Sequence, residues 1–327
     1  IYGAIHAPGV EPSAITVGAT NTFGTDARSD DTVTTYSSRG PTRGGSTDAL
    51  GVRHHDNLIK PDLVAPGNKI IDAAAEDNYL ITTNPWLDAG VSNSDRRRMM
   101  YLNGTSMATP VVAGAAALML QANPRLTPNL VKAILMYTSQ PLAGFNMLEQ
   151  GAGEINVEGA IRLARLVRSD LSNATPLGSP LLTSLLPPLA QTTIAGETFA
   201  WSQGLIIKHG YATGQALIIS YQKIYGLGVL VTDGTLLSNG VLVTDNVMWS
   251  NGGVLGSGSV FIGSGVLVTD NFFTGDGVLV TDGVLVTDGV LVTDAVTQAM
   301  SATTKGDATA ASKPPAKDDE GDEFEDH

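Results

Sequence analysis

The chain has 327 residues, 43% of them hydrophobic, and a formal net charge of −13 at pH 7. This length and apolar content suffice for a buried core and about two domains. The chain has more acidic than basic residues, so it offers no extended basic field for nucleic acid. The sequence contains no cysteine, which excludes disulfides and thiol catalysis. Residues 1–227 are nearly neutral, with 17 acidic and 16 basic residues, so the excess negative charge belongs to the C-terminal third.

The first third of the chain predicts short strands separated by turns and loops. Residues 15–19, I-T-V-G-A, form a β-type run after turn residues and predict a buried strand. Residues 36–42 are polar and predict a loop, whereas residues 60–67, K-P-D-L-V-A-P-G, predict a brief strand that ends in a tight turn. Two segments rich in Gly, Asn, Asp and Ser, residues 43–57 and 77–100, predict surface loops.

A serine follows glycine and threonine at the expected start of a helix. Residues 103–110 read N-G-T-S-M-A-T-P and continue into the apolar segment 111–120. A hydroxyl in this place is held out from the backbone, and the free N–H groups of the helix end lie where an oxyanion would form. Ser106 is therefore a candidate nucleophile, and the alternative is that it only caps the helix. Segment 111–120 is apolar on all sides, which predicts a buried helix that is too short to span a membrane.

Two further helices are predicted after the serine segment. Thr127 is a hydroxyl N-cap, Pro128 suits the first helical position, and apolar residues follow at helical spacing up to residue 136. Residues 150–157 read Q-G-A-G-E-I-N-V and precede an amphipathic helix at 158–167.

The order of these strings along the chain resembles the second half of a subtilisin-like serine protease domain, over residues 1–168. The strings are I-T-V-G-A, Y-S-S-R-G-P, K-P-D-L-V-A-P-G and G-T-S-M-A-T-P. The resemblance implies an α/β fold, a partial parallel sheet with flanking helices, and a serine endopeptidase in which Ser106 forms an acyl-enzyme with protein or peptide substrates. It implies that the chemistry needs no cofactor. It also implies a structural calcium site, to which no residues of this sequence can be assigned, and an extracellular location after secretion from a bacterium.

Other parts of the family's catalytic machinery do not occur in the sequence. The D-[ST]-G, H-G-T-H and A-G-N-x-G strings, which hold the triad Asp, the triad His and the oxyanion Asn in that family, are absent. We expect the missing N-terminal half of the domain to supply them, and we expect the chain as given to be inactive. The histidines match none of the family strings: His6, His54, His55, His209 and His327. His54, His55 and Asp56 are either metal ligands or residues of a solvated loop.

The last part of the chain divides by composition. Residues 169–195 are rich in Leu, Ser and Pro and predict a linker, and residues 196–227 predict a short β region. Residues 228–294 contain eleven hexads, six of them identical G-V-L-V-T-D copies, with one extra glycine. They predict a parallel β-helix or a meander with Asp-Gly turns, with disorder as a third possibility. Residues 295–327 predict a disordered acidic tail.

The hexads suggest a second class of function. One aspartate occurs about every six residues, which either serves the turn or forms a ladder of cation ligands. Val-rich strands also tend to pair at their edges. The alternative to an endopeptidase is therefore a structural or adhesive β-repeat protein with a relic protease half.

Overall fold

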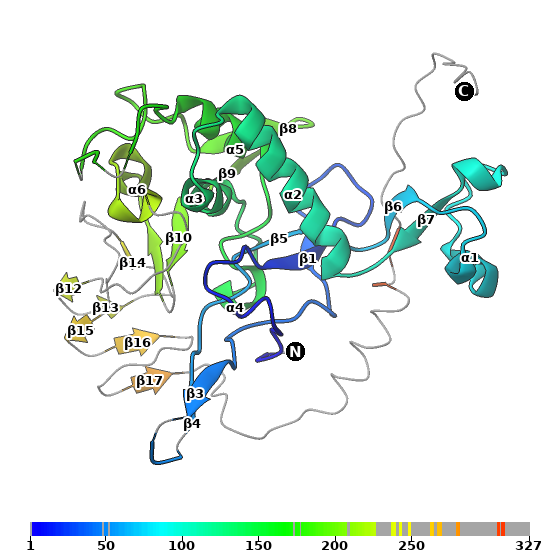
Figure 1. Cartoon of the computed structure of the whole chain (residues 1–327), viewed down its shortest axis with the longest axis horizontal. Helices are drawn as coiled ribbons and strands as arrows, with labels where there is room; N and C mark the ends of the chain where they lie inside the picture. Colours follow the sequence, from blue (N-terminus) through cyan, green and yellow to red (C-terminus); the bar gives the residue numbers. More distant parts are fainter. Residues whose placement is uncertain are drawn as a thin grey trace.

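The computed structural model describes residues 2–47, 49–51, 53–172, 174–176, 178–207, 210–226, 306–307 and 309–310, and six short strands between residues 237 and 281. Its first part has a mixed α/β architecture in which a small sheet is covered by helices (Figure 1).

The central sheet has three strands in the order β2-β1-β5. β1 (Val17–Asn21) and β5 (Leu63–Pro66) are parallel, whereas β2 (Thr32–Val33) is antiparallel to β1. All five residues of β1 are buried, so the strand predicted at 15–19 is confirmed two residues further along. The sheet is mixed because the short β2 returns along the edge of β1 instead of crossing over.

Helices pack on this sheet and on each other. α2 (Thr105–Ala122) lies against β1 and β5, and α5 (Val157–Leu166) packs on both α2 and α3 (Pro128–Thr138). α3 begins as predicted, because the Thr127 hydroxyl accepts a hydrogen bond from Leu130 N at 3.2 Å. The short α4 (Met147–Gln150) precedes the strand-like segment that contains Glu154.

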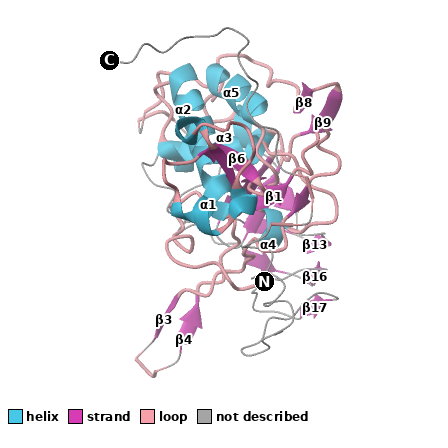
Figure 2. Cartoon of the chain, turned by 90° about the vertical axis from the view of Figure 1, so that its right-hand side faces the viewer, coloured by secondary structure: helices cyan, strands magenta, loops and turns pink. Residues whose placement is uncertain are grey.

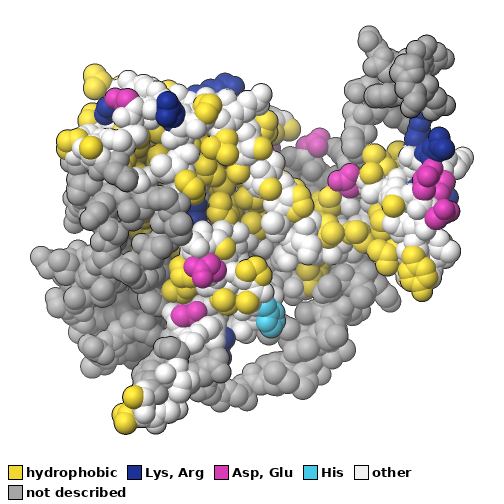
Figure 3. All heavy atoms as spheres, in the orientation of Figure 1, with side chains coloured by type: hydrophobic (Ala, Val, Ile, Leu, Met, Phe, Trp, Pro, Cys, Tyr) yellow, Lys and Arg dark blue, Asp and Glu magenta, His cyan; other side chains and the backbone are white. Residues whose placement is uncertain are grey.

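The prediction for the helix after the serine was wrong in its burial. α2 begins at Thr105, has 18 residues and includes Pro110 in its interior. Only Ala108, Val112, Ala115 and Met119 are buried, because the sheet and α5 cover a single face. The other face is apolar and exposed, with Leu118 45% and Leu120 42% accessible, and Figure 3 shows hydrophobic side chains along the line of this helix. With a mean hydropathy of 1.3, α2 is the one helix in the described ranges that is long and apolar enough to cross a membrane, judged by length and composition alone.

Part of the segment 169–195, predicted as a linker, packs against the core. Leu181 and Leu182 are buried in the same hydrophobic cluster as α3 and α5. Leu181 N donates to Ile219 O at 2.9 Å, and Arg168 N donates to Leu181 O at 3.0 Å. The core therefore continues past residue 168, because the Leu-rich segment has apolar surface to bury and the prolines only exclude a helix.

Residues 196–226, predicted as a short β region, contain strands and also two helical turns. Two antiparallel hairpins are formed by β8 (Gln191–Ile194) with β9 (Glu197–Ala200) and by β10 (Gly204–Ile207) with β11 (Gly210–Thr213). The chain then forms α6 (Ala216–Ile219) and the 3-10 helix η3 (Lys223–Gly226). Leu217 and Ile218 are buried in the main hydrophobic cluster. A short apolar run can be buried either as a helical turn or as a strand, so the sequence alone does not distinguish the two.

The two predicted surface loops have structure of their own. β3 (Gly45–Thr47) and β4 (Arg53–His55) form an antiparallel hairpin that projects from the body (Figure 2). β6 (Ile70–Ala73) and β7 (Met99–Leu102) are antiparallel and flank α1 (Tyr79–Thr83), η1 (Pro85–Leu87) and η2 (Asp95–Arg97). Ile81, Leu87 and Met100 form a small separate apolar cluster there, so this insertion is a minor lobe.

The hexads are described only in short strands. These are β12 (Leu237–Asn239), β13 (Leu242–Val243), β14 (Met248–Trp249), β15 (Ile262–Ser264), β16 (Leu267–Thr269) and β17 (Leu279–Thr281). Leu242 pairs with Leu267, which pairs with Leu279, in parallel register and at the same position of the hexad. A solenoid requires parallel pairing, whereas hairpins of a meander pair antiparallel. The other hexad residues, and the acidic tail apart from residues 306–307 and 309–310, lie outside the described residues.

Candidate active site

Ser106 is the second residue of α2, and its side chain is exposed. The helix is capped by Gly104, which has φ 145°, a value that L side chains rarely adopt. Because the cap is Gly104, without a side-chain hydrogen bond, the alternative role of Ser106 as the N-cap is excluded. The glycine allows the chain to turn sharply from β7 into α2 and to present the next residues at the helix end.

The loop before the serine is fastened to the end of β5. Gly104 N donates to Gly67 O at 2.9 Å, and the Tyr36 hydroxyl donates to the same carbonyl at 2.9 Å. A Cβ on Gly67 would lie 2.7 Å from Gly104 O, so only glycine permits this approach. Asn103 adds a second attachment, because its Oδ1 accepts from Lys69 N at 2.8 Å. The loop therefore has a fixed position relative to the sheet.

The helix end also provides hydrogen-bond donors. Met107 N and Ala108 N both donate to Gly104 O, at 3.0 and 3.3 Å. Across the described ranges, the backbone N–H groups of Thr105 and Ser106 have no hydrogen-bond partner, as is usual for the first turn of a helix. With the partial positive charge of the helix end, these groups can stabilise an anion that forms next to the serine oxygen.

A general base for Ser106 is not found in the described part of the chain, where no histidine is hydrogen-bonded to its hydroxyl. His6 is exposed near the N-terminus. His54 lies in the projecting hairpin next to His55, but the side chains of both lie outside the described residues, as do His209 and His327. No group of three His, Asp or Glu side chains that would hold a metal ion occurs within the described ranges.

Sequence analysis missed the residues that hold the loop in place. Gly67 and Lys69 follow the K-P-D-L-V-A-P segment, and Asn103 precedes the G-T-S string. A glycine directly after a predicted strand indicates a close backbone approach, and that signal was available at Gly67. The contact of Lys69 with Asn103 joins residues 34 positions apart and has no local signal.

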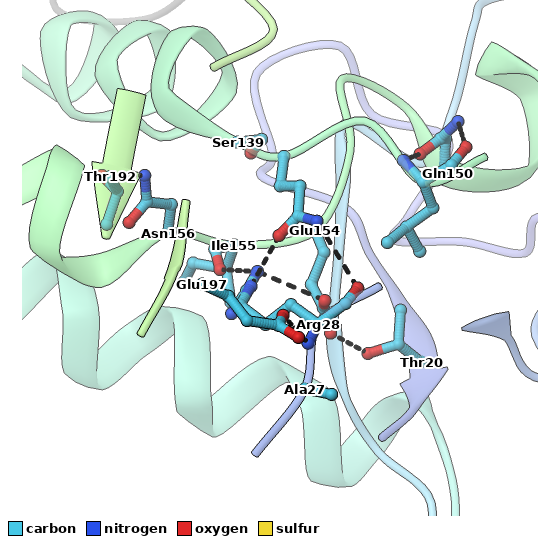
Figure 4. Close-up of polar contacts among 12 residues, drawn as sticks. Thr20, Ala27, Arg28, Ser139, Gln150, Glu154, Ile155, Asn156, Thr192 and Glu197 are labelled. Atoms are coloured by element: carbon cyan, nitrogen blue, oxygen red, sulfur yellow. Dashed lines mark hydrogen bonds and ion pairs between the residues drawn. The ribbon is translucent and has the colours of Figure 1, made fainter. Parts of the chain in front are cut away.

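A buried cluster of charges on the sheet was also not predicted. The Thr20 hydroxyl donates to Glu154 Oε1 at 2.5 Å, and Arg28 Nη2 lies 3.2 Å from Glu154 Oε2 (Figure 4). Asp31 is only 7% exposed and Glu154 is fully buried. Burial raises the pKa of Asp31 to about 8, and the hydrogen bond to Glu154 and the charge of that residue act in the same direction. Asp31 is therefore mostly protonated at neutral pH.

This proton predicts a pH dependence of stability that Asp31→Asn should remove. The native pKa lies above the unfolded value of about 3.9, so the folded chain binds more protons between about pH 4 and pH 8. The contribution of this proton to the free energy of unfolding is therefore complete below about pH 4 and is lost as the pH rises toward about 8. Arg28, Glu154 and Asp30 are the charged groups that affect this carboxyl.

The measurement is the free energy of unfolding in urea between pH 5 and pH 8. We expect it to decrease with pH in the wild type, and to decrease less in Asp31→Asn, because the amide keeps a donor toward Glu154 without titrating. Asp72→Asn, which changes an exposed carboxylate on β6 that does not act on Asp31, is the matched control and should keep the wild-type slope. An unchanged slope in Asp31→Asn would contradict the raised pKa of Asp31.

An exposed serine beside free helix N–H groups, on a loop fixed by glycine, is the arrangement that a serine hydrolase requires of its nucleophile. Residues 3–154 match the model of the family described as the subtilase family. The matched segment makes up a little under half of the chain.

Relatives with curated descriptions to which part of the chain is similar are also serine proteases. The chain is 38% identical over 159 residues to the serine protease AprX of Bacillus subtilis, which covers 48% of this chain and 31% of AprX. It is 33% identical over 138 residues to the subtilisin-like protease SBT4.7 of Arabidopsis thaliana, which covers 40% of this chain and 17% of the plant protein. The chain thus matches about a third or less of the length of these relatives.

Solved structures with a similar arrangement include fervidolysin from Fervidobacterium pennivorans, described as a keratinolytic enzyme related to subtilisin. Its TM-score is 0.36 at 21% identity, over 57% of this chain and 21% of fervidolysin. The CspB protease of Clostridium perfringens has a TM-score of 0.35 at 22% identity, over 51% of this chain and 30% of its own.

Proposed function

We propose that the chain is part of a subtilisin-like serine endopeptidase in which Ser106 is the nucleophile. The observation that supports this most directly is the exposed hydroxyl at the N-terminus of α2, on a loop held by Gly67 and Asn103. The proposed substrates are proteins or peptides, and the proposed location is extracellular, as is common for subtilases.

In this reaction the serine oxygen attacks the carbonyl carbon of a peptide bond while a histidine takes its proton. The negative charge that forms on the carbonyl oxygen is stabilised by hydrogen-bond donors, and Ser106 N–H is one donor that this chain supplies. The amine leaves after receiving the proton, and water then releases the acyl group from the serine.

The base and the aspartate that orients it are proposed to come from polypeptide outside these 327 residues. The sequence has no D-[ST]-G or H-G-T-H string. In addition, α2 exposes an apolar face that begins next to Ser106 and includes Ala113, Ala117 and Leu118. A buried partner for this face would remove apolar surface from water and would place new residues beside the serine. The N-terminal half of the catalytic domain is the proposed partner.

A second candidate function rests on the hexads. The parallel pairing of Leu242, Leu267 and Leu279 at equivalent positions supports a regular β-repeat surface. A structural or adhesive role for this array is compatible with an endopeptidase at the other end of the chain, and it becomes the main function if Ser106 is never activated.

Labelling with a fluorophosphonate, which reacts only with an activated serine, tests the proposal. We expect no labelling of the 327-residue chain alone, because its serine has no base. We expect stoichiometric labelling of a longer gene product that includes in-frame residues encoded upstream of Ile1, mapped to Ser106 by mass spectrometry. Absence of labelling in that longer protein would favour the structural function, and labelling of the short chain would show that the base lies within it.

A further inference from the structure

Residues close to the C-terminus lie against the loop that precedes α2. The two short pieces of residues 306–310, drawn in red in Figure 1, lie near β6 and β7 and contact residues that are more than 200 positions away in the sequence. Gly306 is buried in this contact. The segment therefore has a defined binding place on the protease-like part.

Asp307 is bound through both its carboxylate and its backbone. The Thr35 hydroxyl donates to Asp307 Oδ1 at 2.6 Å, and Thr35 N donates to Oδ2 at 3.3 Å. Asp307 N donates to Asn68 Oδ1 at 2.9 Å. A carboxylate that accepts two hydrogen bonds while its own amide is paired is recognised by its shape, and not only as a negative charge.

Thr309 is recognised by three side chains. Its hydroxyl donates to Asn21 Oδ1 at 3.1 Å and accepts from Asn68 Nδ2 at 3.2 Å. Lys69 Nζ donates to the backbone carbonyl of Thr309. Asn68 Nδ2 also donates to Asn21 Oδ1 at 3.2 Å, and this hydrogen bond holds the two asparagine side chains together where they contact the threonine.

Gly306 brings this segment next to the serine loop. Its φ is +74°, and a Cβ there would lie 2.5 Å from Asn103 Oδ1 and 2.9 Å from Asn68 Oδ1. No larger residue fits without displacing these side chains. Asn103 precedes the helix cap Gly104 and is held by Lys69 N, so the docked segment touches the same residues that fix the position of Ser106.

We propose that Gly306, Asp307 and Thr309 form a docking segment that binds in cis to a site formed by Asn21, Thr35, Asn68 and Lys69. The site recognises a Gly-Asp-x-Thr sequence, and the docking holds this segment beside the serine loop. The inference goes beyond the proposed endopeptidase and does not depend on it, since the contacts are the same whether or not Ser106 is activated.

Crosslinking of introduced cysteines tests the docking in the full chain, which has no native cysteine to interfere. Thr22→Cys and Ala310→Cys place thiols next to Asn21 and Thr309, and a short bismaleimide should join them within one chain. The control pair combines Ala310→Cys with Glu158→Cys on α5, a helix to which the described part of 306–310 makes no hydrogen bond. We expect the crosslinking yield to be roughly tenfold higher for the first pair. A factor of this size in the docked population corresponds to the free energy of about one hydrogen bond.

Variants of the segment make the test specific. In the first cysteine pair, Gly306→Val and Thr309→Val should each lower the yield by roughly tenfold, because a clash or an unpaired asparagine replaces the contact. Thr309→Ser keeps the hydroxyl and should keep the yield, so the serine and valine variants control for each other. Equal yields in the two cysteine pairs, an unchanged yield in Gly306→Val, or a product with the mass of two chains would overturn docking in cis. None of these readouts uses the reactivity of Ser106, so failure here is distinguishable from failure of the proposed function.

Discussion

Replacing Ser106 by alanine in the longer gene product is expected to lower peptide hydrolysis at least on the order of 10³-fold. The alanine cannot form the acyl-enzyme, and only the stabilisation supplied by the N–H donors and by substrate binding remains. Because the serine side chain is exposed and makes no hydrogen bond to any other described residue, its loss should leave the melting temperature unchanged. The measurement is kcat and KM for a peptide substrate, with the effect expected in kcat.

Thr109→Ala is the matched control for this substitution. Thr109 lies one turn later on α2, is also exposed, and its hydroxyl donates only within the helix, to Thr105 O at 2.8 Å. It should change kcat little. Turnover that survives in Ser106→Ala would show that another residue is the nucleophile, and an equal loss in both variants would indicate damage to the helix instead of to the chemistry.

Asp62→Asn is expected to destabilise the fold by about 3–5 kcal/mol, the usual cost of leaving a buried charge without its partner. Asp62 is 1% exposed and bonds to two buried ammonium groups, Lys60 Nζ at 2.8 Å and Lys132 Nζ at 3.1 Å. It also accepts from Thr16 N at 2.8 Å. Burial lowers the pKa of Lys132 to about 8, and the negative charge of Asp62 opposes that shift. Without the carboxylate, two cations face each other in the interior.

This loss is a large part of the roughly 5–15 kcal/mol that stabilises an ordinary domain, so it is measured from the midpoint of urea unfolding. Asp72→Asn changes an exposed carboxylate on β6 and should shift the midpoint little. Adding Lys132→Met to Asp62→Asn removes one of the two cations and should recover part of the loss. A midpoint for Asp62→Asn that equals that of Asp72→Asn would contradict the role of this carboxylate.

Several elements were predictable because their signals are local. The hydroxyl of Thr127, followed by Pro128, specifies a helix start whatever surrounds it, and α3 begins there. The G-T-S string at the start of an apolar run placed Ser106 at a helix N-terminus, and α2 has it there. The mixed α/β class of the first part followed from the order of the same strings.

Burial was predicted poorly because it depends on which surfaces meet. Segment 111–120 is apolar on all sides, yet only the face of α2 that meets the sheet and α5 is covered. Leu181 lies in a proline-rich stretch that reads as a linker, yet it is buried against the main cluster. Leu217 and Ile218 form a run too short to distinguish a strand from a helical turn, and packing selected the turn.

The sequence by itself determined that Ser106 lies at a helix N-terminus, because the serine string and the helix start are encoded in neighbouring residues. Only the tertiary structure decided what surrounds that serine: the carbonyl of Gly67, the side chain of Asn103 and the docked Gly306 come from distant parts of the chain. The same holds for the pKa values of Asp31 and Lys132, which are shifted by burial and by neighbours that folding brings together. Local sequence specifies backbone conformation, whereas burial and charge are properties of contacts between segments far apart in the chain.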